Sequence, residues 1–270
     1  MMSTRSAPLS VRGLQMRFGG LVAVDDVSFE APDGAVTAVI GPNGAGKTTL
    51  FNCITGMYRP TDGKVTFRDH DITGFKPHRI ARQGIARTFQ NLALFSGLSV
   101  IENLIIGGYG QGRSGLVEGM LLGGRAGREE RITEHRAFGI LDFLGIGDLA
   151  HAMPSELPYG RQKQVEFGRV LMQDADLVLL DEPMAGMSRT EKTQMVGLIR
   201  EVREKRGVSF LIVEHDMPVI MDISDHIVVL DFGRKIAEGT PREVLENPAV
   251  IAAYLGADED DDLVSPAHIA

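Results

Sequence analysis

The sequence predicts an α/β fold in which short buried strands alternate with helices. The first indication is a mostly apolar run at residues 35–40, which leads through a glycine-rich turn into a segment of helical periodicity at 47–57. The second is a pair of apolar runs, 177–180 and 209–213, with the pattern of central parallel strands. The third is a helical pattern at 189–205 between that pair, so strand, helix and strand follow one another as in a βαβ unit.

The regions around these strands differ in character. Residues 9–74 alternate short β-like runs with turn signals, which predicts a small antiparallel sheet, and two later β-rich runs within 227–237 flank a hairpin turn. Between residues 98 and 154 the periodicity is helical, and it is interrupted by a glycine-rich segment at 107–127. Residues 257–270 contain a run of acidic side chains, and we expect a solvated, disordered tail there.

Composition argues against several classes of protein. The chain has 270 residues, and its hydrophobic content of 43% is ample for a packed core. The balance of 28 Lys and Arg against 36 Asp and Glu gives a net charge of −8, so no nucleic-acid partner is expected. Cys53 is the single cysteine, which leaves no internal disulfide and suits a reducing cytosol. Because the amino terminus lacks a signal-peptide pattern and no run approaches about 18 apolar residues, we expect neither export by that route nor a membrane span.

A phosphate-binding loop follows the strand predicted at residues 35–40. Residues 41–49, Gly-Pro-Asn-Gly-Ala-Gly-Lys-Thr-Thr, match the pattern G-x-x-x-x-G-K-[ST] without a mismatch. The glycines let successive N–H groups point at a triphosphate, and the following helix presents the positive end of its dipole. The Lys47 ammonium suits the β- and γ-phosphates, and the Thr48 hydroxyl suits a magnesium ion. The candidate nucleotide-binding residues here are Asn43, Gly44, Ala45, Gly46, Lys47, Thr48 and Thr49.

Two carboxylates follow the strand predicted at residues 177–180. Asp181 and Glu182 stand at the carboxyl end of a buried strand, where open α/β sheets bind their ligands. Asp181 is suited to hold magnesium, usually through water, and Glu182 is suited to polarise an attacking water as a general base. Together with the loop, this pair predicts ATP hydrolysis with magnesium as the cofactor.

With these motifs in place, the chain resembles the ATP-binding subunit of an ABC transporter from Leu9 to Gly256. The resemblance implies that Phe18 stacks on adenine, that Gln90 touches magnesium and the attacking water, and that His215 contacts the γ-phosphate. It also places the family signature at Leu157-Pro158-Tyr159-Gly160-Arg161, with Gly160 closing the ATP site of a second subunit, and the D-loop at Ala185-Gly186-Met187-Ser188. The site would then need two ATP-binding subunits, the same or homologous.

The signature and the D-loop depart from the family pattern. Pro158 replaces the usual serine, Tyr159 a glycine and Arg161 a glutamine, while Ser188 stands where an acidic residue or asparagine is usual. Pro158 offers neither a hydroxyl nor an N–H to the γ-phosphate, although the Gly160 N–H and the helix dipole remain. We therefore expect a weakened γ-phosphate contact, and the cross-interface contacts of the D-loop are open to question.

The resemblance implies a single ABC ATPase domain at residues 1–256. Its P-loop NTPase core would carry a flanking antiparallel β subdomain and an inserted helical subdomain at about residues 91–165, followed by the acidic tail at 257–270. Residues after Gln90, namely Leu92, Leu94 and Phe95, are candidates for contacting membrane subunits.

Several segments are most similar in sequence to the ATP-binding subunits of bacterial high-affinity branched-chain amino-acid importers. The segments are residues 17–21, 85–90, 214–217 and 254–256. This similarity implies two integral membrane permease subunits, a periplasmic substrate-binding protein as an indirect partner, and a peripheral location on the cytoplasmic face of the inner membrane. Related subunits serve urea, amides, aromatic acids or lipopolysaccharide export, so the substrate stays open. A non-transport ABC switch is the other alternative, although this chain has one loop and no sustained heptads.

Overall fold

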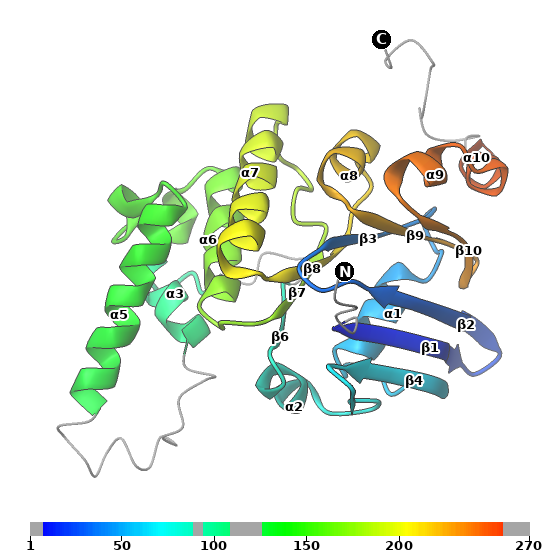
Figure 1. Cartoon of the computed structure of the whole chain (residues 1–270). Helices are drawn as coiled ribbons and strands as arrows, with labels where there is room; N and C mark the ends of the chain where they lie inside the picture. Colours follow the sequence, from blue (N-terminus) through cyan, green and yellow to red (C-terminus); the bar gives the residue numbers. More distant parts are fainter. Residues whose placement is uncertain (1–7, 89–93, 109–125, 256–270) are drawn as a thin grey trace, which may run out of the picture. The chain divides into compact units, whose positions relative to one another are not determined.

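A computed structural model describes residues 8–88, 94–108 and 126–255 (Figure 1). The chain divides into two compact units. Unit 1 comprises Met1–Pro77 and Ser209–Ala270, and unit 2 comprises His78–Val208. The helical subdomain expected at residues 91–165 falls within unit 2, and the acidic tail lies outside the described residues.

Unit 1 contains the antiparallel sheet that the turn signals predict. Its strands are β1 (Leu9–Phe18), β2 (Leu21–Ala31), β4 (Asp62–Phe67) and β5 (His70–Asp71), in the order β2-β1-β4-β5, and the first three lie side by side in Figure 1. All of their pairings are antiparallel. Leu14, Val27 and Phe29 are buried between more exposed neighbours, which is the alternation expected of a sheet with one covered face.

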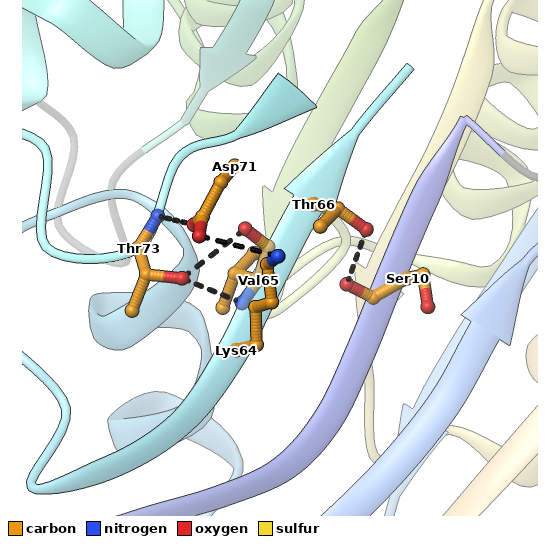
Figure 2. Close-up of polar contacts among 6 residues, drawn as sticks. All are labelled: Ser10, Lys64, Val65, Thr66, Asp71 and Thr73. Carbon is orange, nitrogen blue, oxygen red and sulfur yellow. Dashed lines mark hydrogen bonds and ion pairs between the residues drawn. The ribbon is translucent and has the colours of Figure 1, made fainter. Parts of the chain in front are cut away.

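Polar side chains close the outer edge of this sheet (Figure 2). The Thr73 hydroxyl accepts a hydrogen bond from the Val65 N–H at 2.9 Å and donates to the Val65 carbonyl at 3.3 Å. The Asp71 carboxylate accepts from the Thr73 N–H at 2.9 Å and lies 3.4 Å from the Lys64 ammonium. Hydrogen bonds from Thr73, and secondarily the Lys64 charge, hold the pKa of Asp71 below its usual value. Thr73 thus supplies the acceptor that the Val65 N–H would otherwise find in another strand, while the Val65 carbonyl also accepts from the Ile72 N–H at 3.0 Å.

Unit 1 also contains the strand that precedes the phosphate loop. β3 (Val36–Ile40) is buried at every residue and pairs in parallel with β8 (Ser209–Val213) and β9 (His226–Asp231), and β10 (Arg234–Gly239) pairs antiparallel with β9. The predicted strands and hairpin are therefore confirmed. The helices of the unit are α1 (Lys47–Ile54), α8 (Met217–Ile223), α9 (Pro241–Leu245) and α10 (Pro248–Leu255).

One apolar cluster of unit 1 joins the phosphate-loop strand to the carboxyl-terminal elements. Ala38 and Ile40 of β3 share it with residues of α8, β9, β10, α9 and α10. Its buried members are Ala38, Ile40, Ile220, Ile227, Val229, Ala237, Val244 and Val250, with Met217, Met221, Ile236 and Tyr254 packed against them. The position of the loop therefore depends on packing that involves residues more than 200 positions later in the chain.

Unit 2 combines a parallel strand pair with helices. β6 (Ile85–Arg87) pairs in parallel with β7 (Leu177–Asp181), and the helices are α2 (Pro77–Arg82), α3 (Val100–Gly108), α5 (Ala126–Phe143), α6 (Tyr159–Leu171) and α7 (Arg189–Arg206). β7 and α7 confirm the predictions for residues 177–180 and 189–205. The pattern analysis missed β6, because three residues are too few to establish a period. Within the described ranges, no helix has the length and apolarity needed to span a membrane.

Replacing Thr73 by valine tests the edge contact. Thr73→Val leaves the Val65 N–H and carbonyl without their hydroxyl partner, so we expect a loss of about 1–2 kcal/mol in the free energy of unfolding. Urea unfolding at pH 7 measures it. The matched control is Thr66→Val, because the Thr66 hydroxyl makes a 3.5 Å contact with the Ser10 carbonyl and should contribute less than about 0.5 kcal/mol. Equal effects of the two variants would contradict the assignment.

Candidate nucleotide site

The phosphate loop fits its surroundings only with glycine at two positions. A Cβ on Gly41 would lie 2.0 Å from the Leu230 carbonyl oxygen, and one on Gly46 would lie 2.4 Å from the Ala23 carbonyl oxygen. Both glycines also have φ in the left-handed region, at 148° and 97°. The loop is therefore held against the main chains of β9 and β2, and it leads into α1, whose amino terminus has no side-chain cap. Uncapped N–H groups at a helix start suit a phosphate.

Lys47 lies folded over this loop. Its ammonium donates to the carbonyls of Gly41 at 2.6 Å and Pro42 at 2.8 Å, and the residue is 6% exposed. A buried ammonium needs hydrogen-bond acceptors, and here the loop supplies them itself. The charge is thus already placed at the loop that the sequence predicts to bind phosphate.

The β9–β10 hairpin turn braces the other end of the loop. The Gly233 N–H donates to the Ala45 carbonyl at 3.1 Å, and the Asp25 N–H donates to the Gly233 carbonyl at 2.8 Å. Arg234 then pairs with the Asp25 carboxylate at 2.7 Å. Loop, hairpin and β2 therefore form one hydrogen-bonded assembly. The sequence predicted the hairpin but not this role.

Tyr254 of α10 contacts the first residue of the loop. Burial raises the pKa of the Tyr254 hydroxyl to about 12, and a hydrogen bond from the Gly41 main chain acts in the opposite direction. Because this contact favours the phenolate, the donor is the Gly41 N–H and the phenol oxygen accepts. Tyr254 belongs to the Tyr-Leu-Gly ending that carried part of the family resemblance, which is the only sequence signal that pointed to it.

Phe18 and His215, the other two predicted contacts in unit 1, are both exposed. The Phe18 ring is 42% exposed and meets the Tyr58 ring edge-on, with ring centroids 5.3 Å apart. Sequence reasoning did not single out Tyr58. His215 lies two residues after the end of β8, and Asp216 caps α8 by accepting from the Val219 N–H at 3.2 Å. The cap fixes where the chain turns after His215.

In unit 2, Asp181 lies at the end of β7 and is fully buried. One carboxylate oxygen, Oδ2, is 2.7 Å from the Arg87 guanidinium, and Arg87 is itself largely buried. The other oxygen, Oδ1, has no hydrogen-bond partner among the described residues. The Thr88 hydroxyl accepts from the Asp181 N–H at 3.1 Å. The sequence predicted Asp181 as a magnesium residue but did not predict its ion pair with Arg87.

Glu182 has a main-chain conformation that is rare for its residue type. Its φ is 48°, in the left-handed region that costs a non-glycine residue free energy. The side chain is half-buried at the turn that follows β7. Among the described residues, five other non-glycine positions also have a positive φ, namely Asp26, Arg68, Asp69, Asp174 and Phe232, so this conformation defines the turn after β7 and does not by itself identify a reacting group. Gln90, the third predicted catalytic residue, lies outside the described residues.

The unusual signature residues pack against the D-loop of the same unit. A Cβ on Gly186 would lie 3.0 Å from the Tyr159 ring, and one on Gly160 would lie 2.1 Å from the Glu191 carboxylate. Glu191 and Ser188 form a capping box at the start of α7, with the Ser188 hydroxyl 2.7 Å from the carboxylate. The hydrogen bonds from Ser188 lower the pKa of Glu191. The signature residues Tyr159 and Gly160 thus pack closely against the segment that contains Gly186 and Ser188.

A divalent cation would fit only part of the predicted set. Within the part of the chain that the structure describes, no group of three or more His, Cys, Asp or Glu side chains is arranged to hold a metal ion. The buried Oδ1 of Asp181 is nevertheless an unpaired anionic oxygen, the ligand type that magnesium prefers. One carboxylate with a hydroxyl and phosphate oxygens is a usual magnesium set, so Asp181 fits the ion.

Known families and structures place this site in a class. Residues 24–185 match the family model described as ABC transporter. The chain belongs to this family: it is an ATP-binding cassette, the class of ATPase that is coupled to transport. Residues 234–260 match a second model, described as branched-chain amino acid ATP-binding cassette transporter. The fold class and the family predicted from the motifs are therefore confirmed.

Similar proteins extend over nearly the whole chain. The chain is 43% identical over 248 residues to the high-affinity branched-chain amino acid transport ATP-binding protein LivG of Salmonella typhimurium, covering 92% of this chain and 97% of that protein. It is 41% identical to BraF of Pseudomonas aeruginosa, with the same coverage. A crystal structure of a nucleotide-free ATP-binding cassette matches with a TM-score of 0.80 at 36% identity, covering 91% of this chain and 98% of that one. One in an ADP conformation matches with a TM-score of 0.81 at 33% identity, covering 93% and 100%.

Removing the Tyr254 hydroxyl tests its contact with the loop. Tyr254→Phe keeps the ring but leaves the Gly41 N–H without its acceptor, so we expect a loss of about 1 kcal/mol in unfolding free energy. Because the loop must then be ordered by the nucleotide, we also expect affinity for ADP to fall about threefold or more. Urea unfolding and titration with a fluorescent ADP measure the two effects. Unchanged ADP affinity would show that the contact is structural only.

The same variant has a distinct alkaline signature. The pKa of Tyr254 rises from an ordinary value of 10 to about 12 in the folded chain, so between these pH values the unfolded chain releases a proton that the folded chain keeps. The wild type should therefore lose stability relative to Tyr254→Phe as the pH rises from 10, by up to about 1.4 kcal/mol per pH unit. Parallel stability curves would contradict the burial of this hydroxyl.

Proposed function

We propose that the chain is the ATP-hydrolysing subunit of a bacterial branched-chain amino-acid importer. The observation that carries the proposal is the phosphate loop. Lys47 is buried over this loop, and glycine occupies the two positions, 41 and 46, where a side chain would not fit. The similarity to LivG and BraF and the second family match at residues 234–260 support the substrate class. In this proposal, ATP binding closes a pair of ATP-binding subunits, hydrolysis and release of phosphate let the pair part again, and this cycle moves the membrane subunits.

The nucleotide is held by main-chain and side-chain groups of unit 1. The N–H groups of the loop surround the phosphates, the Lys47 ammonium moves from its carbonyls to the β- and γ-phosphates, and the Phe18 ring stacks on adenine. Exposure of the Phe18 ring supports its role, because a stacking residue needs an accessible face. The proposed binding residues are Phe18, Asn43, Gly44, Ala45, Gly46, Lys47, Thr48 and Thr49.

Magnesium would be held by Thr48, Gln90 and Asp181, partly through water. Bound there, the ion neutralises charge on the phosphate oxygens. Glu182 accepts a proton from the attacking water, and its constrained main chain supports a fixed orientation of the carboxylate. His215 contacts the γ-phosphate and Gln90 orients the water. These roles are proposed from the family motifs, and the burial of Asp181 supports the metal assignment.

A second ATP-binding subunit completes each site in this proposal, because the signature acts on the other subunit's nucleotide. Pro158 is the N-cap residue that precedes α6 and provides no side-chain cap, which leaves the helix start available to a γ-phosphate. Two membrane permease subunits and, indirectly, a periplasmic substrate-binding protein are the further partners. Phe95, which is 48% exposed and lies 5.3 Å below the Arg169 guanidinium, supports a docking surface for the permeases. The subunit would be peripheral, on the cytoplasmic face of the inner membrane.

Transport by the assembled complex tests the substrate class. The chain is co-expressed with candidate permease subunits from the same genome, reconstituted in vesicles, and supplied with a candidate periplasmic binding protein and radiolabelled leucine, urea, a short amide or benzoate. Uptake of leucine that requires ATP supports the proposal. Uptake of another compound alone, or recovery of the chain with ribosomes or DNA in place of permeases, would overturn it in favour of the corresponding alternative.

Glu182→Gln tests the hydrolytic mechanism. Because the amide cannot accept the proton from water, kcat for ATP hydrolysis should fall by about 100-fold or more while ATP binding is retained. The matched control is Glu201→Gln, an exposed position of α7 that pairs with Lys205 and should hydrolyse ATP at the wild-type rate. Phosphate release and size-exclusion chromatography with ATP measure turnover and pairing. Wild-type turnover by Glu182→Gln would refute the base assignment.

Pro158→Ser tests the weakened signature contact. A serine returns a hydroxyl and an N–H at the start of α6, so the KM for ATP should fall about threefold or more with little change in unfolding free energy. Steady-state ATPase assays on the assembled complex measure it. An unchanged KM would show that the helix dipole and the Gly160 N–H already suffice.

A further inference from the structure

Arg87 forms a buried ion pair with the proposed magnesium residue. Its guanidinium lies 2.7 Å from Oδ2 of Asp181, and the two side chains are 11% and 1% exposed. Arg87 ends β6 and Asp181 ends β7, the strand that pairs with it in parallel, so both side chains come from the same edge of the strand pair. The pairing is therefore a fixed feature of the strand register and not a chance encounter of surface side chains.

The burial of this pair makes its charge consequential. A carboxylate as buried as Asp181 is costly without a cation, and the guanidinium supplies that cation in the protein alone. Only Oδ2 is engaged, since Oδ1 has no hydrogen-bond partner among the described residues. The guanidinium thus balances the charge of the carboxylate, and Oδ1 can still bind a second cation.

The neighbouring residue ties the same segment to β7. The Thr88 N–H donates to the Leu179 carbonyl at 2.9 Å, and the Thr88 hydroxyl accepts from the Asp181 N–H at 3.1 Å. Arg87 and Thr88 therefore contact both the side chain and the main chain of Asp181. Gln90, a proposed magnesium contact, follows two residues later in the chain.

We propose that Arg87 is a positioning residue that competes with magnesium for Asp181. In the metal-free protein the guanidinium is the counter-charge of the carboxylate, and a divalent cation at Asp181 must displace it or bind beside a like charge. Arg87 thereby weakens magnesium binding at Asp181. This inference rests on the metal role of Asp181 in the proposed function.

Substitutions that remove or keep the positive charge at residue 87 test this competition. Arg87→Gln keeps a hydrogen-bond donor for Asp181 and removes the positive charge, while Arg87→Lys keeps the charge. Fluorescent ADP is titrated at a series of free Mg²⁺ concentrations and again in EDTA, and Mn²⁺ binding in the presence of ADP is followed by electron paramagnetic resonance. These readouts do not depend on ATP turnover.

We expect Arg87→Gln to lower the half-saturating Mg²⁺ and Mn²⁺ concentrations by about tenfold, with ADP affinity in EDTA unchanged. Arg87→Lys should stay within about twofold of the wild type. The control is Arg136→Met, which removes an exposed ion pair with Asp174 elsewhere in unit 2 and should leave metal dependence unchanged. Thermal unfolding establishes that each variant is folded, and Arg87→Met replaces Arg87→Gln if the latter is not.

A folded, charge-neutral variant with wild-type or weaker metal affinity would overturn the competition and leave Arg87 a structural ion-pair partner. Failure of the proposed function gives a different result. If Asp181→Asn leaves the Mg²⁺ dependence of ADP binding unchanged, the metal assignment itself is wrong, whatever Arg87 does. The two outcomes are read from different variants and so are distinguishable.

Discussion

The close approach of the phosphate loop to two main-chain carbonyls constrains the rest of unit 1. Leu230 of β9 and Ala23 of β2 leave no room for a side chain at Gly41 or Gly46. The loop can hold its shape only if both strands are in these positions, and the hydrogen bond from the Gly233 N–H to the Ala45 carbonyl adds a direct tie between the hairpin and the loop. Its main chain is therefore positioned before any phosphate arrives, and binding then costs little ordering entropy. The terminal helix α10 contributes to the same end through Tyr254.

The two units meet the cost of a buried charge in the same way. Lys47 in unit 1 donates to loop carbonyls, and Asp181 in unit 2 pairs with a guanidinium. Each buried charge therefore has a partner in the protein alone, which lowers the cost of burying it. In the proposed function, phosphate would replace the carbonyls as the partner of Lys47, and a divalent cation would compete with the guanidinium for Asp181.

The sequence predicted the elements with strong local signals and missed the contacts that depend on tertiary structure. β3, β8 and the hairpin have apolar runs and turn residues that identify them, and the loop carries its own motif. β6 is three residues long, so its pattern is too short to detect. Arg87 and Asp181 are 94 residues apart, and Tyr254 and Gly41 are farther still. No local pattern links such pairs. The motif of an apolar strand followed by two carboxylates could locate Asp181, but it could not identify Arg87 as the residue that pairs with it.

The departures in the signature have a physical explanation within the chain. Tyr159 lies against Gly186, where a side chain on residue 186 would come within 3.0 Å of the ring, so the larger signature residue is matched by a glycine in the D-loop. Ser188 stands where an acidic residue or asparagine is usual, and its hydroxyl and Glu191 together cap α7. Glu191 in turn occupies the space beside Gly160. A change at the signature therefore alters packing on the D-loop, and the same holds in reverse. For this reason the signature and the D-loop pack as one structural element.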